Sequence, residues 1–330
     1  MSQDHKLPTP TFTIPQTCTA ESPAGQSSKA IYSTSRGFLV SSVPINTTSD
    51  RPQEKLRQLL AAAPALRRIA QSARAVIHFG PWRQAARAII RRLRPPEKDL
   101  SAWNCALFST EASQLLADLL EQGCANAGTL PPDALCRIQA ISDHLPPGEY
   151  GEFQVAPDID SVTQSATEIA REYLRAEPAL VECTLFVSSP ENPSAKISRD
   201  SDRHFHFEDA GWHSLSLFVY LTDVSMESGA HQLVAGTHRG MKFRDAIRGM
   251  IPEDEVLRRY PDQLRSVIGP PGTMFFEDTS TIHRRRLYKT RHVILHILFV
   301  SHRSWSSRGR RIRTYSEYLR AHRDITAHLD

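Results

Sequence analysis

The chain has 330 residues, of which 40% are hydrophobic, and a formal net charge of +4. This composition supports a substantial folded core, and the mild charge does not by itself indicate a nucleic-acid partner. No apolar run approaches the roughly 20 residues of a membrane-spanning helix, and the N-terminal sequence lacks the pattern of a signal peptide. Five cysteines occur without a CxxC pair, so we expect reduced thiols in a cytoplasmic protein.

The first hundred residues divide into two segments. Residues 1–50 are rich in Ser, Thr and Pro, which predicts a disordered or extended N-terminal arm. Residues 51–96 carry eleven Lys and Arg and one acid, Glu54, with Ala, Leu and Ile at helical spacing. This pattern predicts two or three basic helices. Two interpretations stay open: the helices pack on the core with their arginines in solvent, which we favour, or they contact an anionic membrane weakly.

Pro95-Pro96 marks the start of a third segment, which we expect to form one domain, residues 97–330. Two helices are predicted in its first part. One is opened by Ser109 or Thr110 and ends near Gly123 or Gly128, and the other spans 161–176.

From about residue 180 the pattern becomes that of short strands separated by turn-forming residues. The predicted strands are 181–189, 214–224, 231–235, 264–269, 273–277 and 291–300, with a helical insertion at 243–260. Several short strands at this spacing are typical of a sandwich or barrel. The predicted fold class is α+β, mainly β: a double-stranded β-helix (jelly roll, cupin-like) core at about 180–302, with N-terminal and flanking helices.

Polar residues stand next to the predicted strands. His206 and Glu208 are two residues apart, so on a strand their side chains point to the same face. A second histidine, His283, follows the strand-like sequence TMFFE. Two histidines and one carboxylate are the ligand set of the facial triad, which suits iron(II) and leaves positions open for other ligands.

The sequence between the two histidines carries a resemblance to a known family. LSLFVYLTDVSMESGAHQLVAGTHRG, residues 215–240, and the later FEDTSTIH, residues 276–283, resemble the phytanoyl-CoA dioxygenase family of iron(II)- and 2-oxoglutarate-dependent oxygenases. The resemblance covers roughly residues 180–300 and consists of several motifs in the same order. It implies that His206, Glu208 and His283 bind the metal. Glu208 stands where the family has Asp, and Asp209 is the alternative carboxylate.

The resemblance also implies a site for the cosubstrate, 2-oxoglutarate. The family places an arginine on the last strand for the distal carboxylate, and Arg291 is the matching residue. A guanidinium suits this role because it can donate two parallel hydrogen bonds. Thr279 matches a recurrent threonine near the site. The run Arg284–Arg286 is open to two interpretations, a contact with an anionic substrate or a solvated charge run.

The function that these residues and the resemblance imply is an iron(II)- and 2-oxoglutarate-dependent dioxygenase. It would use O₂ to oxidise, most simply to hydroxylate, a C–H bond of a small-molecule, lipid, sugar or natural-product substrate, with succinate and CO₂ as co-products. The alternative is a non-catalytic jelly-roll relative with a binding or regulatory role, associated with a membrane or nucleic acid through the basic helices. No specific nucleic-acid partner is expected. The substrate, desaturation or cyclisation instead of hydroxylation, and the oligomeric state stay open.

Overall fold

The structure is a computed structural model that describes part of the chain: residues 11–12, 69, 73, 82–93, 107–143, 147–151, 157–190, 204–208, 210, 212–240, 242–301 and 313–314. The chain forms two compact units, Ile14–Arg67 and the remainder. Every described residue belongs to the second of these. Almost all of the predicted N-terminal arm and most of the basic helical segment lie outside the described residues.

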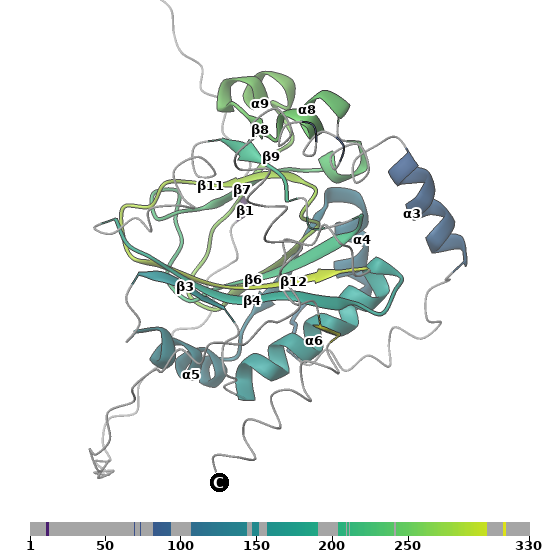
Figure 1. The fold of residues 1–330 in the computed structure, drawn as a ribbon. Helices are drawn as coiled ribbons and strands as arrows, with labels where there is room; N and C mark the ends of the chain where they lie inside the picture. The colour runs from purple at the N-terminus through teal and green to yellow at the C-terminus, as the bar shows by residue number, and fades with distance from the viewer. Residues whose placement is uncertain are drawn as a thin grey trace, which may run out of the picture. The chain divides into compact units, whose positions relative to one another are not determined.

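Two sheets form the centre of the fold (Figure 1). The seven-stranded sheet has the order β13–β4–β12–β6–β10–β2, with β3 also paired to β4. Its strands are β2 (Cys124–Thr129), β3 (Gly148–Gly151), β4 (Ala179–Ser188), β6 (Ser214–Tyr220), β10 (Thr273–Glu277), β12 (His292–Val300) and β13 (Arg313–Thr314). The six-stranded sheet has the order β1–β9–β7–β11–β5–β8. Its strands are β1 (Thr11–Phe12), β5 (Phe205–His206), β7 (His231–Val234), β8 (Met250–Ile251), β9 (Leu264–Val267) and β11 (Ile282–Arg285).

The order of the central strands is that of a jelly roll. From β4 to β7, and again from β9 to β12, the chain crosses to the other sheet at every step. The central orders are therefore β4–β12–β6–β10 and β9–β7–β11–β5, and all of these neighbours pair antiparallel. The predicted fold class is confirmed, and each of the six predicted strands is present. The short strands β5, β8 and β11 were not predicted, because two to four residues are too few for a periodic pattern.

Three helices cover the outer face of the seven-stranded sheet: α4 (Ala112–Gln122), α5 (Pro132–Asp143) and α6 (Pro157–Leu174). Figure 1 shows α5 and α6 on this face. Alternate residues of the strands, such as Leu217 of β6 and Leu295 of β12, share one buried cluster with Leu119 of α4. Helix α4 ends at Gly123, whose φ of 79° suits glycine. The alternative end at Gly128 is wrong, because residues 124–129 form β2.

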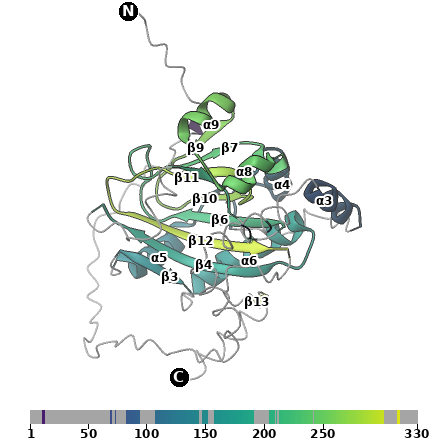
Figure 2. The same ribbon diagram turned by 45° about the horizontal axis from the view of Figure 1, so that its top comes forward.

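The predicted helical insertion consists of two short helices, α8 (Phe243–Arg248) and α9 (Glu253–Arg259), separated by β8. Figure 2 shows α9 next to the six-stranded sheet. Val256 of α9 packs there in a small apolar cluster that includes Phe205 and Ile282. Arg284, from the predicted charge run, is buried on β11 and pairs with Glu253 at the start of α9. It therefore joins the helix to the sheet and is not a solvated residue.

One helix of the predicted basic segment is described, α3 (Trp82–Leu93). Arg83 and Arg87 of this helix are buried, which differs from the expectation that the arginines point to solvent. Arg87 donates a hydrogen bond of 3.0 Å to Asp278, and Arg83 donates to the carbonyl of Trp212. The helix is thus fixed by buried polar contacts to the jelly roll. No helix within the described residues is both long and apolar enough to cross a membrane.

The inner faces of the two sheets carry many polar residues. On β6 and β10, residues such as Leu217 and Phe276 face the helices, so Ser216 and Glu277 face the other sheet. His231 of β7 meets Glu277 from the opposite sheet, with Nε2 and Oε2 2.5 Å apart. Imidazoles and carboxylates are rarely buried without partners or a ligand. These residues therefore indicate a functional site in the interior of the jelly roll.

Candidate metal centre

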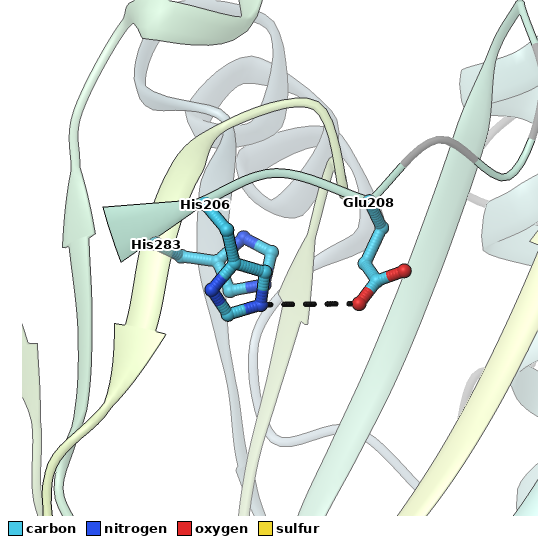
Figure 3. Close-up of side chains that lie close together, drawn as sticks. All are labelled: His206, Glu208 and His283. Carbon is cyan, nitrogen blue, oxygen red and sulfur yellow. Dashed lines mark ion pairs between the residues drawn. The ribbon is translucent and has the colours of Figure 1, made fainter. Parts of the chain in front are cut away.

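The structure brings the three predicted ligands together (Figure 3). His206, Glu208 and His283 each offer a ligand atom, and these atoms all lie within 4.8 Å of one another. The two imidazole rings are 4.6 Å apart between centroids, and Nε2 of His206 lies 3.9 Å from Oε1 of Glu208. This spacing is compatible with binding of a single metal ion by all three side chains.

Backbone pairing fixes the positions of these side chains. His206 of β5 and His283 of β11 are direct antiparallel partners, so their side chains project from the same face. Glu208 lies beyond the end of β5 and is not on a strand, as the i, i+2 argument had assumed. Its side chain still reaches the two imidazoles, because its backbone N–H donates a 2.7 Å hydrogen bond to the carbonyl of Thr279. Asp209, the alternative carboxylate, lies outside the described residues.

Both histidines use Nδ1 for a backbone contact. Nδ1 of His206 lies 3.3 Å from the carbonyl oxygen of His204, and Nδ1 of His283 lies 2.9 Å from that of Thr281. A carbonyl only accepts hydrogen bonds, so each Nδ1 must carry the proton. Nε2 of each ring is then the atom available to a metal ion, as in most metal-binding histidines.

A fully buried carboxylate, Glu277, supports His283 from behind. Oε1 of Glu277 lies 3.1 Å from Nδ1 of His283, and Oε2 contacts His231. Burial opposes the charge on Glu277, but His283 and His231 outweigh it and lower the pKa to about 2. Burial likewise opposes charge on His283, but Glu277 and Glu208 raise its pKa to about 9. Without a metal, the imidazole is therefore protonated at neutral pH, and a metal ion must displace the proton on Nε2. The carboxylate therefore strengthens the electron donation of His283 and holds its ring orientation.

His206 has the opposite electrostatic environment. Burial and the neighbouring His283 lower its pKa to about 4, although Glu208 opposes the shift. His206 is thus neutral at neutral pH, which is the form that binds a metal. The exposed fraction of the side chain rises from 7% for His283 to 17% for His206 and 26% for Glu208. Access to the site is therefore from the side of Glu208.

No protein-family profile and no curated protein matches this sequence. Solved structures similar to it include AviO1 from Streptomyces viridochromogenes Tue57, with 16% identity, 61% of this chain and 98% of that chain covered and a TM-score of 0.42. EctD from S. alaskensis with bound Fe is 15% identical; the match covers 56% of this chain and 75% of EctD, with a TM-score of 0.41. EvdO2 from Micromonospora carbonacea var. aurantiaca complexed with 2-oxoglutarate is 16% identical; the match covers 59% of this chain and 93% of EvdO2, with a TM-score of 0.44. These structures are distant in geometry, so membership of the phytanoyl-CoA dioxygenase family stays a prediction.

The structure does not bring Arg291 to the other predicted site residues. Arg291 comes just before β12, and its guanidinium donates a 2.7 Å hydrogen bond to the carbonyl of Ser142 on α5, at the outer face of the sheet. Strand alternation explains this placement: Val293 is packed against the outer helices, whereas His292 faces the interior. The role of Arg291 as the cosubstrate arginine stays a prediction, which this placement of its guanidinium does not support.

Thr279 is buried at the turn between β10 and β11. Its hydroxyl lies 2.5 Å from the hydroxyl of Ser214, and its carbonyl accepts the N–H of Glu208. The contact that links Thr279 to the three ligands is thus made by its backbone. A direct role of its side chain in cosubstrate binding stays a prediction.

Sequence reasoning missed the interior residues that surround the three ligands. Glu277 is the last residue of TMFFE, where alternation places residues 273, 275 and 277 on one face. Arg285 follows His283 by two residues and was not assigned to the interior. No role was assigned to His231 or His292 from the sequence. The available signal was strand alternation, which applies within one strand at a time: counted from His283 on β11, it marks Arg285 as inward facing.

Replacing Glu277 by glutamine should weaken metal binding by roughly 10- to 100-fold, because glutamine keeps the size but loses the charge that acts on His283. Titration with Co(II), followed by its visible absorption, measures both the affinity and the ligand geometry. Glu182→Gln is the matched control, since Glu182 lies near His296, at 3.6 Å, and not near the three ligands. Equal Co(II) affinity in Glu277→Gln and the unmodified protein would contradict the role given to Glu277.

Proposed function

We propose that the protein is an iron(II)- and 2-oxoglutarate-dependent oxygenase that hydroxylates a C–H bond of a small-molecule, lipid, sugar or natural-product substrate. The observation that carries the proposal is the convergence of His206, Glu208 and His283 inside a jelly roll. Two imidazoles and one carboxylate on one side of a metal ion are the donor set that suits iron(II) and leaves positions for other ligands. We also propose membership of the phytanoyl-CoA dioxygenase family, from the order of its motifs.

Each residue of the site has a distinct role in this proposal. His206 and His283 provide Nε2 as the metal-binding atom, and Glu208 provides an anion that offsets part of the metal's charge. Glu277 orients His283 from the buried side. Iron(II) with 2-oxoglutarate would supply the oxidising chemistry, in which O₂ is consumed and succinate and CO₂ are released.

The surroundings of the site favour a reaction that excludes bulk water. His283 and Glu277 are buried, and the rings of Phe218 and Phe275 stack 5.0 Å apart on the same inner face. A dry environment strengthens the electrostatic interactions of the site and limits side reactions. The substrate would enter from the more exposed side of Glu208. We infer a cytoplasmic location, which the free Cys124, Cys136 and Cys183 support.

The test is succinate release by the purified full-length protein with iron(II), 2-oxoglutarate and O₂, across a panel of acyl-CoAs, lipids, sugars and natural-product intermediates. We expect one substrate class to stimulate succinate release and to gain one oxygen atom by mass spectrometry. His206→Ala is the blank, because it keeps the fold's other contacts and removes one ligand. A protein that binds iron(II) and 2-oxoglutarate but never releases succinate would instead be the non-catalytic relative.

A further inference from the structure

A second group of polar residues faces the interior beyond the metal ligands. This inner cluster consists of Arg285 on β11, Tyr288, His292 at the start of β12, and Ser188 at the end of β4. Ser188 and His292 are direct partners across β4 and β12. Arg285 comes from the opposite sheet, and its Nη1 lies 3.3 Å from Oγ of Ser188. The cluster thus joins the two sheets.

Arg285 is placed by the same strand as the metal ligand His283. The two residues are separated by one position on β11, so both side chains project to the interior. The guanidinium lies over the ring of Tyr288, 5.2 Å from its centre. A cation held between two sheets and against an aromatic ring is suited to an anionic ligand.

Two buried side chains of the inner cluster have polar atoms without a hydrogen bond. His292 is 0% exposed, and neither of its ring nitrogens has a partner among the described residues. The hydroxyl of Tyr288, which stacks on His292, has none either. A buried polar group without a partner is costly, so such groups indicate a ligand or ordered water. Burial, together with Arg285, lowers the pKa of His292 to about 3, so its ring is neutral and offers one N–H donor.

We propose that the inner cluster binds the distal carboxylate of 2-oxoglutarate, with Arg285 as the principal cation and Tyr288, His292 and Ser188 as additional donors. This inference rests on the proposed function and assigns the cosubstrate to residues other than Arg291. A guanidinium, a phenol, a neutral imidazole and a hydroxyl together match the acceptor oxygens of one carboxylate.

The distance along β11 supports this assignment. Two residues on a strand correspond to about 6.6 Å, which is of the order of the length of a five-carbon dicarboxylate. A keto acid end at His283 would therefore leave the distal carboxylate near Arg285. Arg291, by contrast, is bonded to the carbonyl of Ser142 on the helix-covered side.

The test compares 2-oxoglutarate with pyruvate, which has the same keto acid but no distal carboxylate, by calorimetry on the Mn(II)-loaded protein. Arg285→Met should weaken 2-oxoglutarate binding about 30-fold or more, as expected for loss of the charged partner of a carboxylate, and leave pyruvate binding unchanged. Arg291→Met is the matched control and should leave both unchanged. His292→Phe, which keeps the ring and removes its nitrogens, should give a smaller loss for 2-oxoglutarate alone, and thermal unfolding checks that each variant is folded.

The opposite pattern, with 2-oxoglutarate binding lost in Arg291→Met and kept in Arg285→Met, overturns the inference. A separate measurement on the metal-free protein distinguishes this failure from failure of the proposed function. Glutarate, a dicarboxylate without the keto group, should raise the Tm of the unmodified protein and not that of Arg285→Met. If the unmodified protein does not bind Mn(II), the proposed function is contradicted but the inference is not. If glutarate changes the Tm of the unmodified protein and of Arg285→Met equally, the assignment of the distal carboxylate to the inner cluster is contradicted.

Discussion

Replacing His206 or His283 by alanine should weaken iron(II) binding by more than about 100-fold, since loss even of a residue behind a ligand costs roughly 10- to 100-fold. One ring nitrogen of each histidine and one carboxylate oxygen of Glu208 lie within 4.8 Å of one another, so each variant leaves two of the three ligand atoms. Metal content after anaerobic loading, measured by elemental analysis together with the binding affinity, checks the result. Succinate release should be lost in parallel.

His204→Ala is the control for this experiment. It removes an imidazole from the same segment and keeps the backbone carbonyl that accepts from His206, so metal binding should not change. Glu208→Ala and Asp209→Ala then identify the carboxylate ligand. Loss of metal binding in Asp209→Ala and not in Glu208→Ala would move the carboxylate by one residue, and normal binding in both histidine variants would remove the metal site altogether.

The parts of the fold that the sequence predicts are those with a long periodic pattern. β6, β10 and β12 are apolar enough to be assigned without structure, and the meeting of His206 with His283 follows from the motif order that resembles a known family. The prediction of Glu208 as a ligand assumed that residues 206 and 208 lie on one strand, but Glu208 lies beyond the end of β5. Its position depends on the hydrogen bond to Thr279, a residue 71 positions later, and no local pattern contains that contact.

The search for a cosubstrate arginine shows why the inward-facing residues of the site are hard to predict from sequence. In HVILHILFV, both faces of the strand are mostly buried and carry mainly apolar residues, so the average hydrophobicity does not reveal which residues face the interior. An arginine at the head of such a strand is equally compatible with either face. The polar residues His292 and His296 are the signal, because their spacing of four marks one face as polar. With that face inward, Arg291 points outward.

The helices also show the limit of local patterns. CANAGT, residues 124–129, has no alternating apolar pattern, yet it forms the edge strand β2 against β10. The tertiary pairing with β10 determines its conformation, and glycine at position 123 ends the helix. Arg83 and Arg87 are a similar case, because a basic amphipathic pattern gives no sign of a buried acidic partner.

That partner, Asp278, is fully buried between α3, α6 and the turn that carries Thr279. Its carboxylate accepts hydrogen bonds from Arg87, from the hydroxyl of Tyr173 and from the backbone N–H of Ser280, at 3.0, 2.8 and 3.0 Å. Burial opposes its charge, but Arg87 and Arg83 outweigh burial and hold the pKa of Asp278 well below its usual value. Asp278 therefore stabilises the folded state as an anion.

Asp278→Asn should lower the free energy of unfolding by about 3–5 kcal/mol at neutral pH, because the change leaves the guanidinium of Arg87 buried without its counter-ion. Urea unfolding followed by circular dichroism measures the change. Lys289→Gln is the matched control: Lys289 pairs with Glu227 at 3.1 Å, but both side chains are exposed, so its loss should cost less than about 1 kcal/mol.

The pH dependence of stability separates the contribution of the Asp278 charge from that of its packing and hydrogen bonds. A carboxyl group whose pKa is lower in the folded state contributes its full stability above the unfolded pKa, near 4, and loses it as the pH falls toward the folded pKa. The difference in stability between the unmodified protein and Asp278→Asn should therefore be largest at neutral pH and shrink in acid. A difference that stays constant from pH 7 to pH 3 would mean that asparagine fails in packing or hydrogen bonding, and that the ion pair with Arg87 contributes no net stability.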